Sequence, residues 1–301
     1  MPMHPLFAPL IPLLAAFPGL ATQDGVPQAG QTDVVELNRD RHDRMTVPVR
    51  VLDQGPFQFL IDTGAQNTVI STALASKLAL VPNRRAKLVG VAGSEMVDTV
   101  DIDQIDLGRR SYYGLMAPLL RGEHIGADGI IGLDSLQDQR VLMDFRKGLM
   151  AINDAKSLGG NAGYEIVVTA RRMSGQLIMA DARIDGVQTS VVIDTGAENS
   201  IGNLALQRAL SRRAHHGTTT LNSVTGQTIE AQIGFGRALK IQDMQLNNVW
   251  IAFAAAPAFD ALGLGKKPAL LLGMRDLRSF DRVAIDFASR KILFDLPRAT
   301  L

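Results

Sequence analysis

The chain has 301 residues, of which 46% are hydrophobic and 20% are charged, and its formal net charge is +1. This composition is ordinary for one bilobed or two separate globular domains, so it argues against extensive disorder. The absence of cysteine excludes disulfides, thiolate metal sites and a cysteine nucleophile, and without a clustered basic face the sequence predicts no nucleic-acid partner.

The first element in chain order is an apolar segment over residues 6–21. Such a segment is shorter than the roughly twenty residues of a transmembrane helix, so no stable membrane span is predicted. Its length, and the small residues Gly19 and Ala21, are typical of a signal peptide. Against this stand three prolines and the lack of Lys or Arg. Residues 1–30 are therefore interpreted as a signal segment or, alternatively, a disordered extension. Export is the predicted localisation, with the cytoplasm as the alternative.

Short strands come next, predicted over residues 47–52 and 57–61 with a turn at 53–56. The second strand leads into FLIDTGAQNTVIS, which contains Asp62, Thr63, Gly64 and Ala65. A short helix is predicted over 71–78. Three further landmarks follow it in order, namely LVGVAGSEMV (88–97), GIIGLDSL (129–136) and LMDF (142–145).

A linker rich in glycine and small polar residues occupies positions 154–163. Beyond it, strands are predicted over 177–184 and 189–193 around an Asp-Gly turn, and a second helix over 204–210. The same landmarks then return as VVIDTGAENSIGN (191–203), LNSVTGQTIE (221–230), LLLGMRDL (270–277) and AIDF (284–287).

The spacing of these landmarks indicates a duplicated domain. Asp62 and Asp194 are 132 positions apart, and Gly93 and Gly226 are 133 apart. Gly132 and Gly273 are 141 apart, which indicates an insertion in the second copy, placed within 254–268. The repeat predicts a mostly β protein with two lobes, residues 31–155 and 164–301, and one or two short helices in each.

An aspartate that follows apolar β-formers is held by a rigid strand and partly shielded from water. Glycine at the next-but-one position allows another chain to come close, and threonine can form a hydrogen bond to the other lobe. Two such sites related by a pseudo-twofold axis would bring two carboxylates together, and the pair would share one proton. That arrangement supplies a general base for water and a general acid for a carbonyl oxygen. No metal or cofactor is predicted, because no two histidines have the spacing of a zinc hydrolase.

These motifs resemble the retropepsin-like branch of the aspartic proteases, in the bacterial form that fuses both halves in one chain. The resemblance rests on D-T-G-A at 62–65 and 194–197 and on the apolar-apolar-Gly segments at 130–132 and 271–273. It covers residues 45–152 and 175–296. It implies two pseudo-twofold-related β-barrel lobes, in which each apolar-apolar-Gly strand supports a D-T-G loop from beneath.

The same resemblance implies roles for individual residues. Asp62 and Asp194 would be catalytic. The substrate-binding residues would be Thr63, Gly64, Ala65, Thr195, Gly196 and Ala197, with Gly93 and Gly226 in hairpins that close over the peptide as flaps. A surface turn that merely contains glycine is the alternative for each hairpin. The sequences Leu133-Asp134 and Met274-Arg275-Asp276 differ between the copies, which predicts an asymmetric cleft.

The expected function is an aspartic endopeptidase that hydrolyses an extended polypeptide with a water activated between two aspartates. A monomer is expected, because the short linker gives each lobe a high effective concentration near the other. One alternative is a non-catalytic peptide-binding or regulatory module on the same fold. Another is a two-carboxylate hydrolase such as a glycosidase, but those usually take their acid and base from dissimilar contexts.

Overall fold

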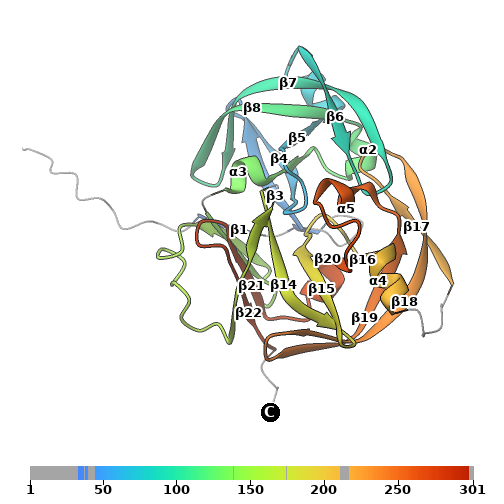
Figure 1. Cartoon of the computed structure of the whole chain (residues 1–301). Coiled ribbons are helices and arrows are strands. Elements are labelled where there is room, and N and C mark those ends of the chain that lie inside the picture. Colours follow the sequence, from blue (N-terminus) through green and yellow to red (C-terminus); the bar gives the residue numbers. More distant parts are fainter. Residues whose placement is uncertain are drawn as a thin grey trace, which may run out of the picture. The chain divides into compact units, whose positions relative to one another are not determined.

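Strands dominate the computed structural model of this chain, which describes residues 33–36, 38–39, 45–137, 139–173, 175–210 and 217–297 (Figure 1). The predictions for residues 1–30 lie outside the described residues. The described strands form three sheets, one for each copy of the repeat and one that contains strands of both.

The first copy forms an eight-stranded sheet in the order β2-β3-β4-β9-β5-β8-β7-β6. An additional pairing of β3 with β7 closes it into a barrel, with Val49 opposite Leu107. Inward-facing valines alternate with less buried residues along β3, the two-residue period of a strand with one buried face. The strands are β2 (Asn38–Arg39), β3 (Met45–Val51), β4 (Gln54–Ile61), β5 (Val69–Ser71), β6 (Arg84–Val89), β7 (Ser94–Leu107), β8 (Arg110–Leu120) and β9 (Gly129–Ile131).

The second copy repeats this topology as β13-β14-β15-β20-β16-β19-β18-β17, and an additional β14–β18 pairing closes it. The predicted two-lobed, mostly β fold is thereby confirmed. The strands are β13 (Arg171–Met173), β14 (Gln176–Ile184), β15 (Val187–Ile193), β16 (Ser200–Asn203), β17 (Thr218–Asn222), β18 (Thr228–Ile241), β19 (Met244–Ala254) and β20 (Ala269–Leu272).

A six-stranded sheet, in the order β1-β11-β10-β21-β22-β12, joins the two copies. At its centre β10 pairs with β21, and Leu142 lies opposite Ala284. These two residues occupy matching positions in LMDF and AIDF, so the pseudo-twofold axis passes through this pair. The strands are β1 (Asp33–Glu36), β10 (Arg140–Asp144), β11 (Leu149–Asn153), β12 (Ile166–Thr169), β21 (Arg282–Asp286) and β22 (Lys291–Asp295).

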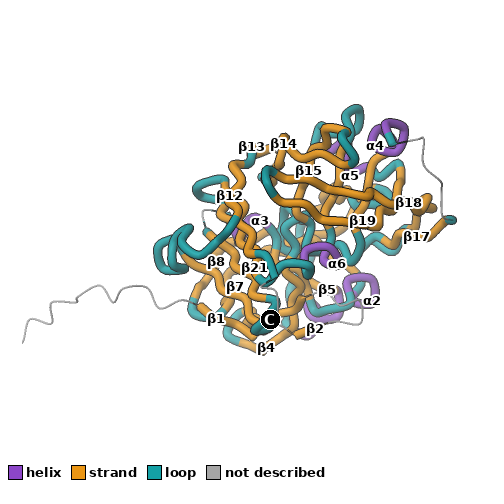
Figure 2. The backbone as a smooth tube through the Cα atoms, turned by 90° about the horizontal axis from the view of Figure 1, so that it is seen from below, coloured by secondary structure: helices purple, strands orange, loops and turns teal. Residues whose placement is uncertain are grey.

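The described part of the chain contains six short helices, three in each copy (Figure 2). Two lie where the sequence predicts them, and their N-termini are capped by Ser71 Oγ and Asn203 Oδ1. The other four are about one turn long, too short to show a helical period, so the prediction of one or two per lobe was too low. They are α1 (Thr72–Lys77), α2 (Gly122–Ile125), α3 (Leu133–Leu136), α4 (Leu204–Ala209), α5 (Pro257–Ala261) and α6 (Met274–Leu277).

Two hairpin turns in matching positions differ from each other in sequence. The predicted turn at Asp185-Gly186 is present between β14 and β15. In the first copy the predicted four-residue turn is wrong, because β4 already begins at Gln54. Leu52 and Asp53 take left-handed φ values of 49° and 61°, so they complete the turn in two residues.

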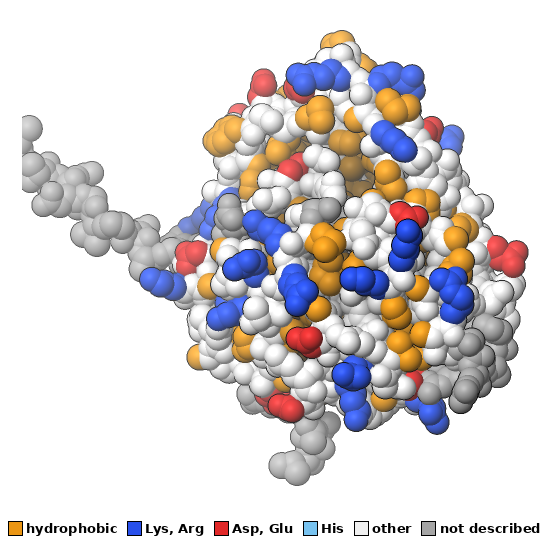
Figure 3. All heavy atoms as spheres, in the orientation of Figure 1, with side chains coloured by type: hydrophobic (Ala, Val, Ile, Leu, Met, Phe, Trp, Pro, Cys, Tyr) orange, Lys and Arg blue, Asp and Glu red, His pale blue; other side chains and the backbone are white. Residues whose placement is uncertain are grey.

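No helix in these described ranges combines the length and the hydropathy that crossing a membrane requires. On the face shown in Figure 3, basic and acidic side chains are interspersed rather than gathered by sign, in keeping with the net charge of +1.

Candidate active site

The two D-T-G segments meet where the lobes join, and their threonines interlock. Thr63 N donates to Thr195 Oγ1 at 3.0 Å, and Thr63 Oγ1 donates to the Ile193 carbonyl at 2.9 Å. The reciprocal bonds run from Thr195 N to Thr63 Oγ1 at 3.3 Å and from Thr195 Oγ1 to the Ile61 carbonyl at 2.7 Å. Both threonines are buried. Each lobe therefore fixes the loop that carries the other lobe's aspartate.

Within each loop the aspartate is held by the backbone that follows it. Asp62 Oδ1 accepts hydrogen bonds from the N–H groups of Gly64, at 2.7 Å, and Ala65, at 3.1 Å. Asp194 Oδ1 accepts two bonds of 3.1 Å from the matching residues, Gly196 and Ala197. Both aspartates are partly buried, and their orientation is set before any ligand arrives.

The two carboxylates face the same point beside Gly64. A Cβ built on this glycine would lie 2.8 Å from Asp194 Oδ1 and 3.0 Å from Asp62 Oδ1. These two oxygens therefore cannot be farther apart than the sum of those distances. A Cβ on Gly196 would overlap the carboxylate of Asp62. The glycines are required here by the close approach of the opposite lobe, not by backbone conformation.

Strands β9 and β20 support the two loops in the way the resemblance implies. Asp62 N donates to the Ile131 carbonyl at 3.1 Å, and Leu133 N donates to the Ala65 carbonyl at 2.9 Å. In the second copy Asp194 N and Met274 N make the corresponding bonds, at 3.0 and 2.9 Å. The glycines that end these strands are needed for space. A Cβ on Gly132 would overlap the backbone of Asn67, and one on Gly273 would lie 2.6 Å from the carbonyl carbon of Asn199.

Sequence analysis missed a second anchor of each loop, formed by a hydroxyl and a carboxylate. Asp134 accepts hydrogen bonds from the backbone N–H and the hydroxyl of Thr68, and Asp276 accepts one from the hydroxyl of Ser200. Thr68 and Ser200 both lie six residues after a D-T-G aspartate, a repeat that the sequence does contain. The two carboxylates come from positions shifted by one residue, so divergent sequences perform the same task.

The anchor of the second lobe leads to a prediction about pH. Burial raises the pKa of Asp276 above its usual 3.8, although the Ser200 hydrogen bond and Arg275 oppose the shift. The folded state then binds a proton more readily than the unfolded state, so this group's contribution to stability is greatest below pH 3.8 and declines as pH rises through the folded pKa. We expect Asp276→Asn, which keeps an oxygen for Ser200, to lose this decline.

The measurement is the free energy of unfolding in denaturant at about pH 3 and about pH 7. Relative to wild type, the variant should be more stable at the higher pH than at the lower one. Asp98→Asn, at an exposed position, is the matched control. Equal effects of Asp276→Asn at both pH values would contradict the prediction.

The hairpins β6–β7 and β17–β18 turn at residues 90–93 and 223–227, where the sequence predicts flaps. Their tips meet. A Cβ on Gly90 would overlap Ser223 Oγ, and one on Gly93 would overlap the Gln227 amide. Gly226, with a φ of 83°, lies against the ring of His124 from α2. Each tip therefore reaches the opposite lobe.

Two buried apolar clusters receive the flap valines across the lobe boundary. Val224, from the second lobe, packs against the first-lobe cluster, and Val91, from the first lobe, packs against the second-lobe cluster. Ala65 and Ala197 of the D-T-G-A motifs lie against the clusters of their own lobes. The first-lobe cluster is Leu60, Val69, Val97, Leu120, Ile125 and Ile130; the second-lobe cluster is Ile178, Val192, Ile201, Ala256, Phe259, Leu262, Leu264, Ala269 and Leu271.

The insertion predicted within residues 254–268 contains α5 and the loop after it, and it makes the second-lobe cluster larger. Phe259, Leu262 and Leu264 of this segment belong to the cluster. Asn203 holds the loop, because its Nδ2 donates to the carbonyls of Leu264 and Lys267 at 2.9 and 2.7 Å. The predicted asymmetry of the cleft thus has a structural origin.

The contact between flap tips leads to a second prediction. Gly90→Ala places a methyl group against Ser223 Oγ but only 3.5 Å from Ser223 Cβ. Overpacking of this kind costs roughly 1–3 kcal/mol, so we expect kcat/KM for a peptide to fall by about ten-fold or more. Removing the hydroxyl should restore activity in the double variant Gly90→Ala/Ser223→Ala. Steady-state kinetics on the four proteins of this cycle provide the measurement. Additive losses in the double variant would contradict a direct contact.

Within the described part of the chain, no group of three or more His, Cys, Asp or Glu side chains is arranged to hold a metal ion. One further polar residue lies at the site. Gln176, on β14 of the second lobe, is buried, and its Nε2 donates to the carbonyl of Gly64. It is a third link between the second lobe and the loop of Asp62, and the repeat pattern did not reveal it.

Comparison with curated proteins found no matching relative. Comparison with protein families matches residues 47–135 and 180–275 to the family described as aspartyl protease. The two matched regions contain the two D-T-G segments, the two flap hairpins and the two supporting strands, and together they make up more than half of the chain. The chain therefore belongs to the aspartyl protease family.

Proposed function

We propose that this protein is an aspartic endopeptidase that hydrolyses peptide bonds of an extended polypeptide. The observation that carries the proposal is the meeting of Asp62 and Asp194 beside Gly64, with their loops interlocked by Thr63 and Thr195. Family membership alone supports a peptidase. The position of the two carboxylates supports the specific mechanism.

In the proposed reaction the two carboxylates share one proton, because both cannot be ionised cheaply at this distance. The ionised aspartate takes a proton from water as its oxygen attacks the scissile carbonyl carbon. The protonated aspartate gives its proton to the carbonyl oxygen. Collapse of the tetrahedral species returns a proton to the amide nitrogen and breaks the C–N bond. The near-equal contexts of the two aspartates leave open which one starts as the acid.

The substrate is proposed to lie as an extended strand between the flaps and the D-T-G loops. The backbone groups of Gly64 and Gly196 would form main-chain hydrogen bonds with it, as in other modes of strand recognition. Gly93 and Gly226 would allow the flap tips to come close to the peptide. The two apolar clusters would accept side chains on either side of the scissile bond once Val91 and Val224 move aside.

Two further proposals concern the state of the protein. We propose that it acts as a monomer, since both halves of the dyad come from one chain and bond to each other directly. We also propose that it is exported, on the basis of the apolar segment at residues 6–21. Sedimentation of the purified protein and fractionation of producing cells would test these proposals.

The decisive experiment is cleavage of a peptide library with and without a pepstatin-type inhibitor over a range of pH. Cleavage within peptides, inhibition by the statine analogue and a bell-shaped pH dependence are expected for a dyad that works with one proton. The alternative of a non-catalytic module predicts measurable peptide affinity with no cleavage at any pH. That result would overturn the proposal.

A further inference from the structure

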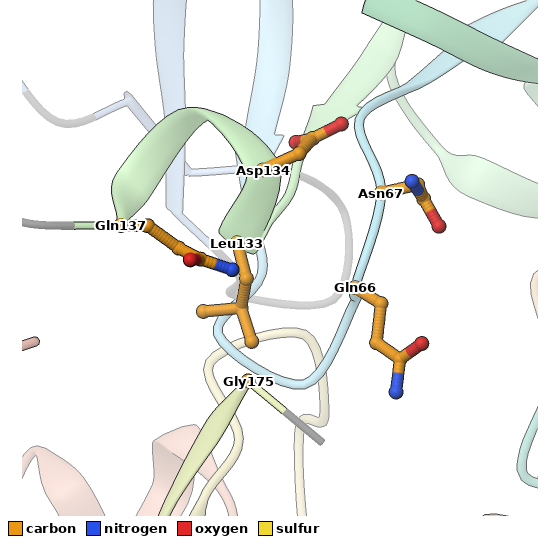
Figure 4. A pocket seen from close by; sticks show the side chains of 6 residues that line it. All are labelled: Gln66, Asn67, Leu133, Asp134, Gln137 and Gly175. Carbon is orange, nitrogen blue, oxygen red and sulfur yellow. The ribbon is translucent and has the colours of Figure 1, made fainter. Parts of the chain in front are cut away.

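A hollow of about 300 Å³ lies at the end of the catalytic loop of the first lobe (Figure 4). One wall carries Gln66 and Asn67, the two residues that follow D-T-G-A at 62–65. The other carries Leu133, Asp134 and Gln137, from α3 and the residue after it, with Gly175 at the edge of the second lobe. We call this hollow the carboxamide pocket, since three of its six lining residues are Gln or Asn.

The carboxamide pocket offers hydrogen bonds without a free charge. Each carboxamide provides two donors and an acceptor. The ionisable residue in its lining is Asp134, which already accepts the backbone N–H of Thr68 on both oxygens, at 3.0 and 2.9 Å, and the Thr68 hydroxyl at 2.7 Å. A neutral polar side chain could be satisfied here, whereas an ion would lose water of hydration without gaining an uncommitted counter-charge.

Gln176 connects this pocket to the dyad. It follows the pocket residue Gly175 in the chain, it is 3% exposed, and its Nε2 bonds to the Gly64 carbonyl. Its Oε1 is buried and has no hydrogen-bond partner among the described residues. A buried acceptor without a donor is costly. It would be satisfied by an N–H group of a ligand passing from the dyad toward the pocket.

The pseudo-twofold repeat places different chemistry at the other end. The counterparts of Gln66 and Asn67 are Glu198 and Asn199, 132 positions later, and the counterpart of Gln137 is Arg278, 141 positions later. Two carboxamides are thus replaced by a carboxylate and a guanidinium. The two ends of the cleft therefore differ in charge although they share one architecture.

We propose that the carboxamide pocket is a substrate subsite that selects a neutral hydrogen-bonding side chain, such as Gln, Asn or Ser, on one side of the scissile bond, while the opposite end interacts with charged side chains. A polypeptide would then bind in one direction only. This inference rests on the proposed function, because it names the substrate preference of the same cleft.

The experiment is a positional scan of peptides that keep apolar residues beside the scissile bond and vary the flanking positions on both sides. It is read twice, as cleavage by the wild-type protein and as binding affinity for Asp62→Asn, which needs no turnover. At one flanking position we expect Gln, Asn and Ser to exceed Asp and Lys by about ten-fold, the scale of one unsatisfied hydrogen-bonding group. The opposite flank should lack this preference.

The double variant Gln66→Glu/Gln137→Arg gives the pocket the residues of the other end. Its preference at that flanking position should shift toward charged side chains. The control, Gln188→Glu/Gln245→Arg, makes the same chemical change at exposed positions of the second lobe and should keep the wild-type preference.

The possible outcomes separate the two proposals. Equal preferences on both flanks in wild type, or a preference for Lys or Asp at every flanking position, would overturn the subsite even if the double variant failed to fold. A neutral-polar preference in binding without any cleavage would overturn the endopeptidase and support the subsite.

Discussion

Asp62→Asn and Asp194→Asn are each expected to reduce peptide cleavage by about 10²–10⁴-fold, the usual contribution of general acid–base catalysis. Either change leaves one carboxyl group where the mechanism needs an acid and a base. Asparagine keeps the oxygen that accepts the N–H groups of Gly64 and Ala65, or of Gly196 and Ala197. The loops should therefore keep their shape, and the loss should appear in kcat rather than in stability.

The measurement is kcat and KM on one cleaved peptide, with thermal unfolding of each variant as the test of folding. Asp98→Asn, on the exposed surface of the first lobe, is the control and should behave as wild type. Full hydrolysis by both single variants would end the two-carboxylate mechanism. Loss of activity together with a large loss of stability would mean that the aspartates hold the fold rather than carry the chemistry.

Asp286→Asn is expected to lower the free energy of unfolding by about 3–5 kcal/mol, the usual cost of removing one partner of a buried ion pair. Asp286 lies opposite Arg140 across the central pair of the six-stranded sheet, with 2.8 Å between Oδ2 and Nη2. Both side chains are almost fully buried. Arg140 also donates to the Gly160 carbonyl and to Asn161 Oδ1, so the pair connects both copies of the repeat with the linker.

Denaturant unfolding with a two-state analysis checks this value. The control is Asp281→Asn, which breaks the pair with Arg146, another ion pair between the two copies. Arg146 is 59% exposed and lies 3.4 Å from Asp281, so this change should cost at most about 1 kcal/mol. Equal effects of the two substitutions would mean that burial adds nothing to the Arg140 pair.

The same variant should change the pH dependence of stability. Burial acts to raise the pKa of Asp286, but the Ser289 N–H and Arg140 outweigh it and lower the pKa below its usual 3.8. The stabilisation from this group is present above pH 3.8 and lost as pH falls through the folded pKa. Asp286→Asn should therefore lose more stability near neutral pH than in acid. A constant difference at all pH values would contradict this assignment.

Much of the candidate site could be predicted from the sequence because the repeat places each half-site in the same local context. Asp62 and Asp194 follow apolar strands, and the glycines after them mark close approaches, so their neighbourhood depends on residues adjacent in the chain. Gln176 could not be found in this way. Its contact with Gly64 joins residues 112 positions apart, and nothing in the local pattern of β14 indicates which surface it meets.

The loop anchors are an intermediate case. Thr68 and Ser200 stand at matching positions, but Asp134 and Asp276 are out of register by one residue, and side-by-side comparison read them as divergence. In three dimensions α3 and α6 each turn a carboxylate toward the same hydroxyl. A helical turn lets neighbouring positions serve one contact, and a linear alignment does not contain that freedom.

By itself, the sequence determined the duplication, the mostly β lobes, the positions of the two D-T-G loops and the strands beneath them, because period, turn residues and repeat spacing are local properties. It also located the Asp185-Gly186 turn but not the turn at Leu52 and Asp53, whose left-handed conformation is imposed by the pairing of β3 and β4. Only the tertiary structure decided that the threonines interlock, that each flap valine packs in the opposite lobe and that Arg140 holds the linker. Those contacts join residues far apart in the chain, and their energies exist only once both lobes are folded and pressed together.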